Sequence, residues 1–316
     1  MHTTMKRRHW RALVGALAGT LVLASGAVLS APAASADGQP GVGQHHRHAH
    51  HRPGYLALGD SVAFGYRPPE VVAPPTLYLD AANFVGYPEV LARRARLHLV
   101  NASCPGETTG SMIDATAQSY ACENLLGLPG GYRTQFPLHV TYQGSQLDFA
   151  VHYLRRHPHT RLVSIDIGAN DVFACQATTV DHCTGTDFAA VTAQVEDNLD
   201  TILAALRHRA HYHHRLVVLT YYSLDYADPV GTAAIEALNA ALVRAAHAHR
   251  AVVADGFGAF EAAAAPAGGD VCAAGLIIAL PSGGCNVHPT LEGQRILATA
   301  VRQVAGRLQP GDHRHR

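Results

Sequence analysis

Short runs of apolar residues recur along the chain and alternate with longer segments in which apolar residues follow a helical spacing. Several of the short runs are almost continuously apolar, which is typical of strands buried on both faces of a parallel sheet. These runs predict five strands, at residues 55–58, 97–101, 162–167, 216–220 and 252–254.

The segments between the runs predict helices. Between Val191 and Leu203, apolar residues recur at the spacing of one helix face. The predicted helices lie at residues 88–95, 146–156, 188–208, 232–247 and 291–308. Strand–helix alternation of this kind predicts an α/β fold, a three-layer α/β/α sandwich around a mostly parallel five-stranded sheet.

Two long segments interrupt this alternation. Residues 66–86 contain four prolines, which favours a loop, and residues 107–145 contain the turn signal Pro129-Gly130-Gly131. Both segments follow the carboxyl ends of the first two predicted strands. We therefore expect them to form the walls of a substrate cleft.

Residues 1–36 have the pattern of a secretory signal peptide: a basic start, an apolar stretch at 12–29 and the small residues Ala34-Ser35-Ala36. An uncleaved membrane anchor is the alternative, because the apolar stretch approaches the ~20 residues that span a bilayer. The small residues favour cleavage after Ala36. We expect a secreted, extracellular protein without a stable membrane span after cleavage.

The rest of the chain divides by composition. Residues 37–53 are rich in glycine, proline and histidine, which predicts a flexible linker, with metal binding by the histidines as the alternative. Residues 54–309 show no break and are expected to form one domain, followed by a disordered tail at 310–316. Basic and acidic residues balance at 24 each, and no basic stripe is present, so a nucleic-acid partner is not expected.

All six cysteines follow the expected cleavage site, and an even number in an exported protein predicts disulfides. Pairing neighbours along the sequence closes three short loops, which costs little chain entropy. The expected bridges are Cys104–Cys122, Cys175–Cys183 and Cys272–Cys285. A metal site is not expected, because no Cys-x-x-Cys pair is present.

Four short strings lie at predicted strand ends or in loops: Gly59-Asp-Ser61, Cys104-Pro-Gly106, Gly168-Ala-Asn170-Asp and Val287-His288-Pro. A serine at the carboxyl end of the first strand lies where open α/β sheets bind ligands, and His288 is a candidate base for it. Taken alone, Ser61 is better interpreted as a helix cap, and the alternative for His288 is a polar loop residue before the last helix. Together the strings favour a nucleophile and its base.

In these four strings, and across residues 54–309, the sequence resembles the SGNH, or GDSL-type, hydrolase family. The resemblance implies a flavodoxin-like fold and a secreted esterase or lipase that hydrolyses carboxylic esters through an acyl-serine intermediate, without a cofactor. It implies Ser61 as the nucleophile and His288 as the base. It also implies an oxyanion hole formed by the N–H groups of Ser61 and Gly106 and the side-chain amide of Asn170.

The sequence departs from the family's pattern three residues before the histidine, where Cys285 stands in place of the usual aspartate. We expect the backbone carbonyl of Cys285 to accept the hydrogen bond from His288 Nδ1. Asn286 is the second candidate, and Asp255 and Asp270 are remote ones. Because the base must be neutral, activity is expected to rise with pH through about 6.5.

The expected substrate is a small-molecule or lipid ester. One alternative is a carbohydrate esterase that removes acyl groups from a polysaccharide. An alternative of another class is a non-catalytic secreted protein that binds ligands or scavenges metal through its histidine tract.

Overall fold

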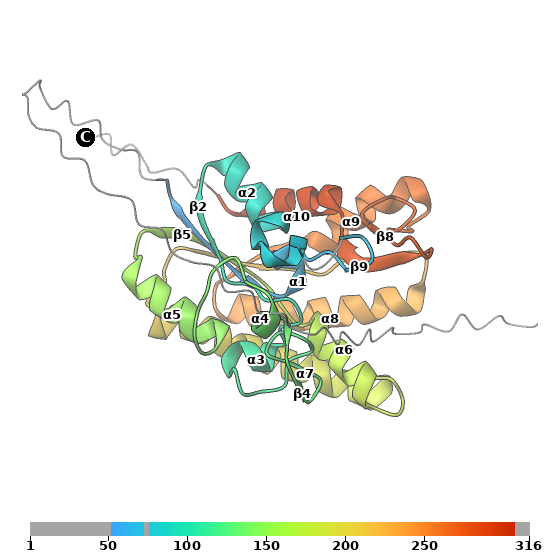
Figure 1. Ribbon diagram of the computed structural model, residues 1–316, viewed down its shortest axis with the longest axis horizontal. Coiled ribbons are helices and arrows are strands. Elements are labelled where there is room, and N and C mark those ends of the chain that lie inside the picture. Colours follow the sequence, from blue (N-terminus) through green and yellow to red (C-terminus); the bar gives the residue numbers. More distant parts are fainter. Residues whose placement is uncertain (1–51, 73–75, 307–316) are drawn as a thin grey trace, which may run out of the picture. The chain divides into compact units, whose positions relative to one another are not determined.

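The computed structural model describes residues 52–72 and 76–306. The expected signal peptide, most of the histidine-rich linker and the expected tail at 310–316 lie outside the described residues. The helices and strands carry the labels of Figure 1.

A parallel sheet of five strands runs through the domain in the order β2-β1-β5-β6-β7. The strands are β1 (Gly54–Gly59), β2 (His98–Asn101), β5 (Thr160–Asp166), β6 (Arg215–Leu219) and β7 (Val252–Ala254). All five predicted strands are confirmed, and their ends agree to within two residues.

Helices cover both faces of this sheet (Figure 1). On one face lie α2 (Tyr87–Ala95), α9 (Gly256–Ala264) and α10 (Leu291–Val304), which pack against one another and the adjoining strands. On the other lie α3 (Thr109–Ile113), α5 (Gln146–Arg156), α6 (Ala169–Thr178), α7 (Gly185–Ala204) and α8 (Pro229–Ala248). The predicted three-layer α/β/α sandwich is confirmed.

The helices differ in detail from the prediction. Helix α7 continues as a π-helical turn, Ala205–Arg209, and α10 ends at Val304 instead of 308. Helices α6 and α9 were not predicted, nor were the short helices α1 (Ser61–Phe64), α3 and α4 (Tyr132–Gln135).

Two small hairpins lie outside the main sheet, and neither was predicted. One pairs β3 (Asn124–Leu125) with β4 (Leu128–Pro129), and the other pairs β8 (Ile277–Ala279) with β9 (Cys285–Pro289). Single 3₁₀ turns occur at Thr76–Leu79, Ala81–Asn83 and Ala265–Ala267. The described part of segment 66–86, residues 66–72 and 76–86, is therefore irregular apart from two short turns, as its prolines predict.

The core lies on both sides of the sheet. Leu56, Leu58, Val163 and Ile165 of the two central strands are fully buried. Burying an aliphatic side chain of this size stabilises the fold by about 1.5–3 kcal/mol, which explains why the strands are apolar at consecutive positions. Among the described helices, none combines the length and apolarity needed to cross a membrane.

Candidate active site

Ser61 lies in a sharp turn between β1 and α1. Gly59 has a φ of 137°, and a Cβ at this position would lie 2.2 Å from the carbonyl oxygen of Asp166, so only glycine fits. Asp60 caps the helix, because its Oδ1 accepts a hydrogen bond from Val62 N at 2.9 Å. The turn therefore places Ser61 at the first position of α1, at the carboxyl end of a central strand.

The structure brings His288 to Ser61, although 227 positions separate them along the chain. His288 Nε2 lies 2.8 Å from Ser61 Oγ, within hydrogen-bonding distance. His288 belongs to β9, whose neighbouring residue Val287 accepts a hydrogen bond from Tyr222 Oη at 2.6 Å. This pair has the geometry of a nucleophile and a general base.

The partner of His288 Nδ1 differs from the expected one. Asn286 Oδ1 is hydrogen-bonded to Nδ1, and it also accepts from the backbone N–H of His288 at 3.2 Å. Residues two apart on a strand face the same way, so Asn286 rather than the Cys285 carbonyl reaches the imidazole. Asn286, the second candidate, is therefore the partner of His288 Nδ1, and the expectation that the Cys285 carbonyl has this role was wrong.

The two remote candidates have other contacts. Asp255 caps α9 by accepting from Gly258 N at 2.8 Å. Asp270 accepts from Cys272 N at 2.8 Å and stabilises a turn. Neither carboxylate has a hydrogen bond to His288 among those of the described residues.

Burial lowers the pKa of His288 to about 4, because desolvation disfavours the charged imidazolium. This is lower than the value near 6.5 on which the expected pH dependence was based. At neutral pH the imidazole is uncharged and can accept a proton from Ser61.

Two backbone N–H groups in the site have no acceptor among the described residues, namely those of Ser61 and Gly106. Gly106 has a φ of 83°, and a Cβ there would lie 2.5 Å from Ala121 N, so glycine is required. Both groups were expected to donate to an oxyanion, and both are available to do so.

Asn170, the third expected donor, lies in the first turn of α6. Its Nδ2 donates to the backbone oxygen of Glu107 at 3.0 Å and to Asp60 Oδ2 at 3.3 Å. The amide is thereby fixed between the loop that carries Gly106 and the turn that carries Ser61.

Two carboxyl groups are buried beneath the Ser61 turn. Desolvation raises the pKa of Asp60 to about 6, and Asp60 Oδ2 accepts a hydrogen bond from Tyr221 Oη at 2.6 Å. Desolvation and the nearby charge of Asp60 raise the pKa of Asp166 well above its ordinary range.

A further carboxylate, that of Asp171, joins the motif at residues 168–171 to the segment that follows Gly106. Asp171 accepts from Thr109 N at 2.9 Å and from Thr109 Oγ1 at 2.6 Å, which ties the start of α6 to the start of α3. Sequence reasoning gave no role to Asp171 beyond its place in the motif.

Aromatic side chains from the two long loops meet beside His288. The ring of Tyr66 lies 4.8 Å from the ring of His288. Tyr66 in turn packs against Tyr78 of its own loop and Tyr132 of the other, each at 6.1 Å between ring centroids. The two loops expected to wall a cleft therefore contact each other next to the candidate base.

The structure pairs the six cysteines as expected from the sequence, with S–S distances of 1.99, 1.95 and 2.04 Å for Cys104–Cys122, Cys175–Cys183 and Cys272–Cys285. In the described part of the chain, one group of side chains is close enough to hold a metal ion: Cys104, Glu107 and Cys122. Because the two sulfurs are joined in a disulfide, they cannot act as thiolate ligands. This group does not fit a metal.

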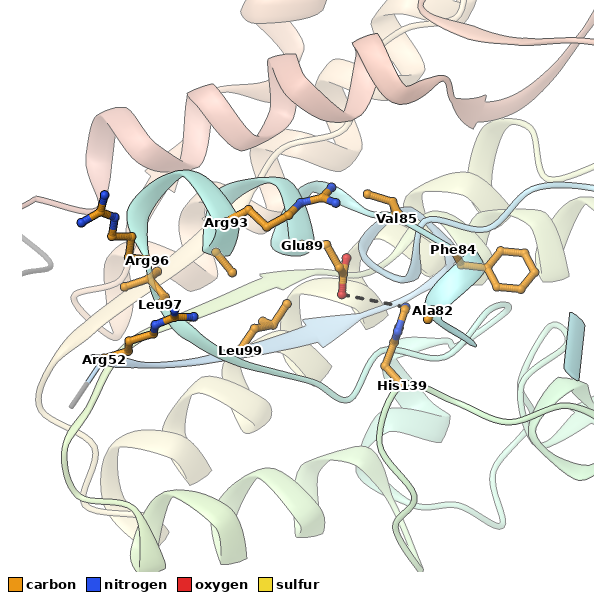
Figure 2. A pocket seen from close by; sticks show the side chains of 11 residues that line it. Arg52, Ala82, Phe84, Val85, Glu89, Arg93, Arg96, Leu97, Leu99 and His139 are labelled. Carbon is orange, nitrogen blue, oxygen red and sulfur yellow. Dashed lines mark ion pairs between the residues drawn. The ribbon is translucent and has the colours of Figure 1, made fainter. Parts of the chain in front are cut away.

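A separate cavity of about 620 Å³ lies beside α2 and β2 (Figure 2). Figure 2 shows the exposed side chains of Arg52, Arg93 and Arg96 at this cavity, and His139 Nε2 3.9 Å from Glu89 Oε1. His139 Nε2 is also 3.0 Å from the backbone oxygen of Phe64 in α1. Neither Ser61 nor His288 lines the cavity, so it is distinct from the catalytic pair.

The comparisons with known proteins agree with this architecture. The model of the GDSL-like Lipase/Acylhydrolase family matches residues 57–296. A search of curated protein sequences finds no match.

Solved structures with a similar fold include a catalytic mutant of an acetylxylan esterase from Geobacillus stearothermophilus, at 14% identity and a TM-score of 0.51 over 83% of this chain and 98% of that one. They also include a lipase from a goat rumen metagenome, at 15% identity and a TM-score of 0.49 over 81% and 99%. Phospholipase A1 from Streptomyces albidoflavus is 18% identical, with a TM-score of 0.47 over 80% and 99%. At 14% identity, the likeness to the acetylxylan esterase mutant shows the fold alone.

Proposed function

Because the chain belongs to the GDSL-like lipase/acylhydrolase family of serine ester hydrolases, we propose that it is a secreted esterase in which Ser61 and His288 cleave carboxylic esters. One observation carries the assignment of these two residues: the distance of 2.8 Å between Ser61 Oγ and His288 Nε2. A neutral imidazole at this distance can accept the hydroxyl proton as the oxygen attacks.

The reaction follows from this geometry in two halves. Ser61 Oγ attacks the ester carbonyl carbon while His288 Nε2 takes its proton, and the tetrahedral intermediate then expels the alcohol, which receives that proton. Water attacks the acyl-serine in the second half, again giving its proton to His288. Collapse returns the proton to Ser61 and releases the carboxylic acid. No cofactor takes part in these steps.

The oxyanion of each intermediate needs donors that are already in position. Support for Ser61 N–H and Gly106 N–H in this role comes from their lack of an acceptor among the described residues. Asn170 would contribute the proton that it shares with Asp60 Oδ2. Loss of one such donor costs about 2.7–4 kcal/mol of transition-state stabilisation.

Secretion is supported by two independent features. The N-terminal residues 1–36 have the pattern of a signal peptide, and three disulfides join all six cysteines. Disulfides persist in oxidising compartments such as the extracellular space.

A polysaccharide O-deacetylase is the second candidate, and the position of Tyr66 favours it. Its ring lies 4.8 Å from the ring of His288, the group that would protonate the leaving alcohol. An aromatic ring with a polar end can pack against the apolar face of a sugar while its hydroxyl forms a hydrogen bond.

The test uses p-nitrophenyl esters of increasing acyl length together with an acetylated xylo-oligosaccharide. We expect turnover by the wild type and none above background by Ser61→Ala. Turnover of long-chain esters would favour a lipase, whereas turnover restricted to acetyl groups would favour the deacetylase. A fluorophosphonate should label Ser61, as identified by peptide mass spectrometry; labelling of a different hydroxyl, or hydrolysis that survives in Ser61→Ala, would refute the assignment.

A further inference from the structure

The side-chain amide of Gln146 binds the main chain just before Ser61. Gln146 Oε1 accepts from Gly59 N at 2.6 Å, and Gln146 Nε2 donates to Gly59 O at 3.0 Å. Gln146 is the first residue of α5 and is fully buried. One amide therefore binds both polar groups of the last residue of β1.

This contact compensates for the early end of a neighbouring strand. Strand β2 pairs with β1 only as far as Asn101, opposite Ala57, and the chain then turns into the loop that carries Gly106. Beyond that point Cys104 N reaches Gly59 O at 3.1 Å, but no backbone acceptor reaches Gly59 N within the described residues. The amide of Gln146 takes the place of the missing peptide group, because a buried N–H requires a partner.

The same side-chain amide of Gln146 also binds the loop that carries Gly106. Gln146 Nε2 donates to Glu107 Oε2 at 3.0 Å, and the Glu107 side chain is fully buried. Glu107 follows Gly106 directly, and its backbone oxygen accepts from Asn170 Nδ2 at 3.0 Å. Gln146 thus bridges the strand that leads to Ser61 and the residue that joins Gly106 to Asn170.

We propose that Gln146 is a positioning residue, which sets the spacing between the nucleophile Ser61 and the oxyanion donors Gly106 and Asn170. The proposal rests on the ester-hydrolase function above. Small displacements matter here, since oxyanion donors must lie at hydrogen-bonding distance from an oxygen that exists only in the transition state.

The chain offers a matched control at another strand end. Asn239 of α8 binds Tyr221, just after β6, with the same pair of bonds: Tyr221 N donates to Asn239 Oδ1, and Asn239 Nδ2 donates to Tyr221 O, both at 2.8 Å. Asn239 is also buried, but it has no hydrogen bond to the loop of Gly106 among those described. Its removal deletes an equivalent bridge that binds only the main chain of Tyr221, which reaches Asp60 through its side-chain hydroxyl alone and has no described hydrogen bond to Ser61, Gly106 or Asn170.

The experiment compares Gln146→Met with Asn239→Leu, each an apolar side chain of similar shape. For Gln146→Met we expect kcat to fall by roughly 10- to 100-fold with KM within about threefold, because the lost alignment acts on the transition state. For Asn239→Leu we expect a similar fall in melting temperature and a change in kcat of less than about threefold.

A second readout isolates the oxyanion. The ratio of kcat/KM for an oxygen ester to that for the matching thionoester reports how well the donors fit an oxyanion, since sulfur is larger and a weaker acceptor. We expect this ratio to fall in Gln146→Met and to stay at the wild-type value in Asn239→Leu. A purely structural role would lower the melting temperature without changing the ratio.

The exchange variant Gln146→Glu/Glu107→Gln keeps an acceptor for Gly59 N and an amide donor between the two side chains. We expect it to recover much of the kcat lost in Gln146→Glu alone, and this pair carries the test if Gln146→Met does not fold. Equal kcat losses in Gln146→Met and Asn239→Leu, an unchanged thionoester ratio, or no recovery in the exchange variant would overturn the proposal. A wild-type chain inactive on every ester would instead refute the proposed function.

Discussion

The two halves of the site are built differently. Ser61 follows a central strand of the five-stranded sheet, and Asp60, Glu107 and Gln146 around it are buried. Gln146 binds Glu107, and Asn170 links Glu107 to Asp60. His288 lies on the two-stranded β8–β9 hairpin, outside that sheet, and residues 285–288 of its strand are only partly buried. In the proposed mechanism, the half that stabilises developing charge is therefore part of the core, and the half that transfers the proton is attached to it.

Strand β9 is less buried than the central strands, since Pro289 is the one buried residue among its five. The Cys272–Cys285 disulfide holds one end of β9, and Tyr222 holds the backbone oxygen of Val287 at 2.6 Å. Segments with fewer buried contacts open locally at a lower free energy than the core. The histidine half should therefore be the first part of the site to lose its geometry under stress.

The largest effect is expected from removing either reacting side chain. Ser61→Ala and His288→Ala should each lower kcat by about 10⁴-fold or more, and the double variant should lose little beyond either single one, because the two residues act as a unit. Steady-state kinetics on a p-nitrophenyl ester, with circular dichroism to verify folding, measures this. If the kcat losses of the two single variants add up in the double variant, Ser61 and His288 do not act as a unit.

Loss of the Nδ1 acceptor should have the next largest effect. In Asn286→Ala the imidazole loses the group that fixes its tautomer, and we expect kcat to fall by roughly 10- to 100-fold with KM little changed. Asn286→Asp restores an acceptor and should keep most of the activity. Wild-type kcat in Asn286→Ala would mean that another group, such as the Cys285 carbonyl, orients the ring.

The disulfides allow the two halves to be compared directly. Removing Cys272–Cys285, as the double serine variant, should lower activity by about threefold to tenfold at temperatures where far-UV circular dichroism is unchanged, because only the hairpin loosens. Removing Cys175–Cys183, which closes a loop between α6 and α7, provides the control. Equal effects on activity would argue against a separately attached histidine half.

The smallest expected effect is the change in kcat/KM with pH near neutrality, which depends on the titration of His288. His288 is active when neutral, and burial lowers its pKa to about 4, so kcat/KM should remain nearly constant from pH 7 to 5 and fall by half near pH 4. The unfolded chain binds this proton near pH 6.5, so His288 contributes a loss of stability as the pH falls from 6.5 towards 4.

Asp60 provides the control for that profile, since its pKa is raised to about 6 and it contacts Asn170. A fall in kcat/KM near pH 6 that disappears in Asp60→Asn would assign the acid limb to Asp60. A fall near pH 6.5 in both proteins would show that His288 keeps its ordinary pKa.

The sequence predicted the sheet well because strands buried on both faces must be apolar at consecutive positions. It did not predict α6 or α9. Helix α9 contains two glycines, and α6 has no regular apolar face, so neither has a strong helical pattern. The cap formed by Asp255 was the available signal for α9.

The site was predictable only in part. The order of the motifs pointed to Ser61 and His288, whereas alternation along a strand, once β9 is recognised, points to Asn286 instead of Cys285. Gln146 carried no signal in the sequence, because its contact with Gly59 spans 87 positions and depends on where α5 begins relative to β1.

The 227 positions between Ser61 and His288 also have a consequence for biosynthesis. A ribosome makes Ser61 227 residues before His288, so over that interval the nascent polypeptide carries the proposed nucleophile without its base. In the proposed mechanism, hydrolytic competence arises only when the β8–β9 hairpin docks. The cell that produces the protein is thereby spared an active hydrolase until that docking.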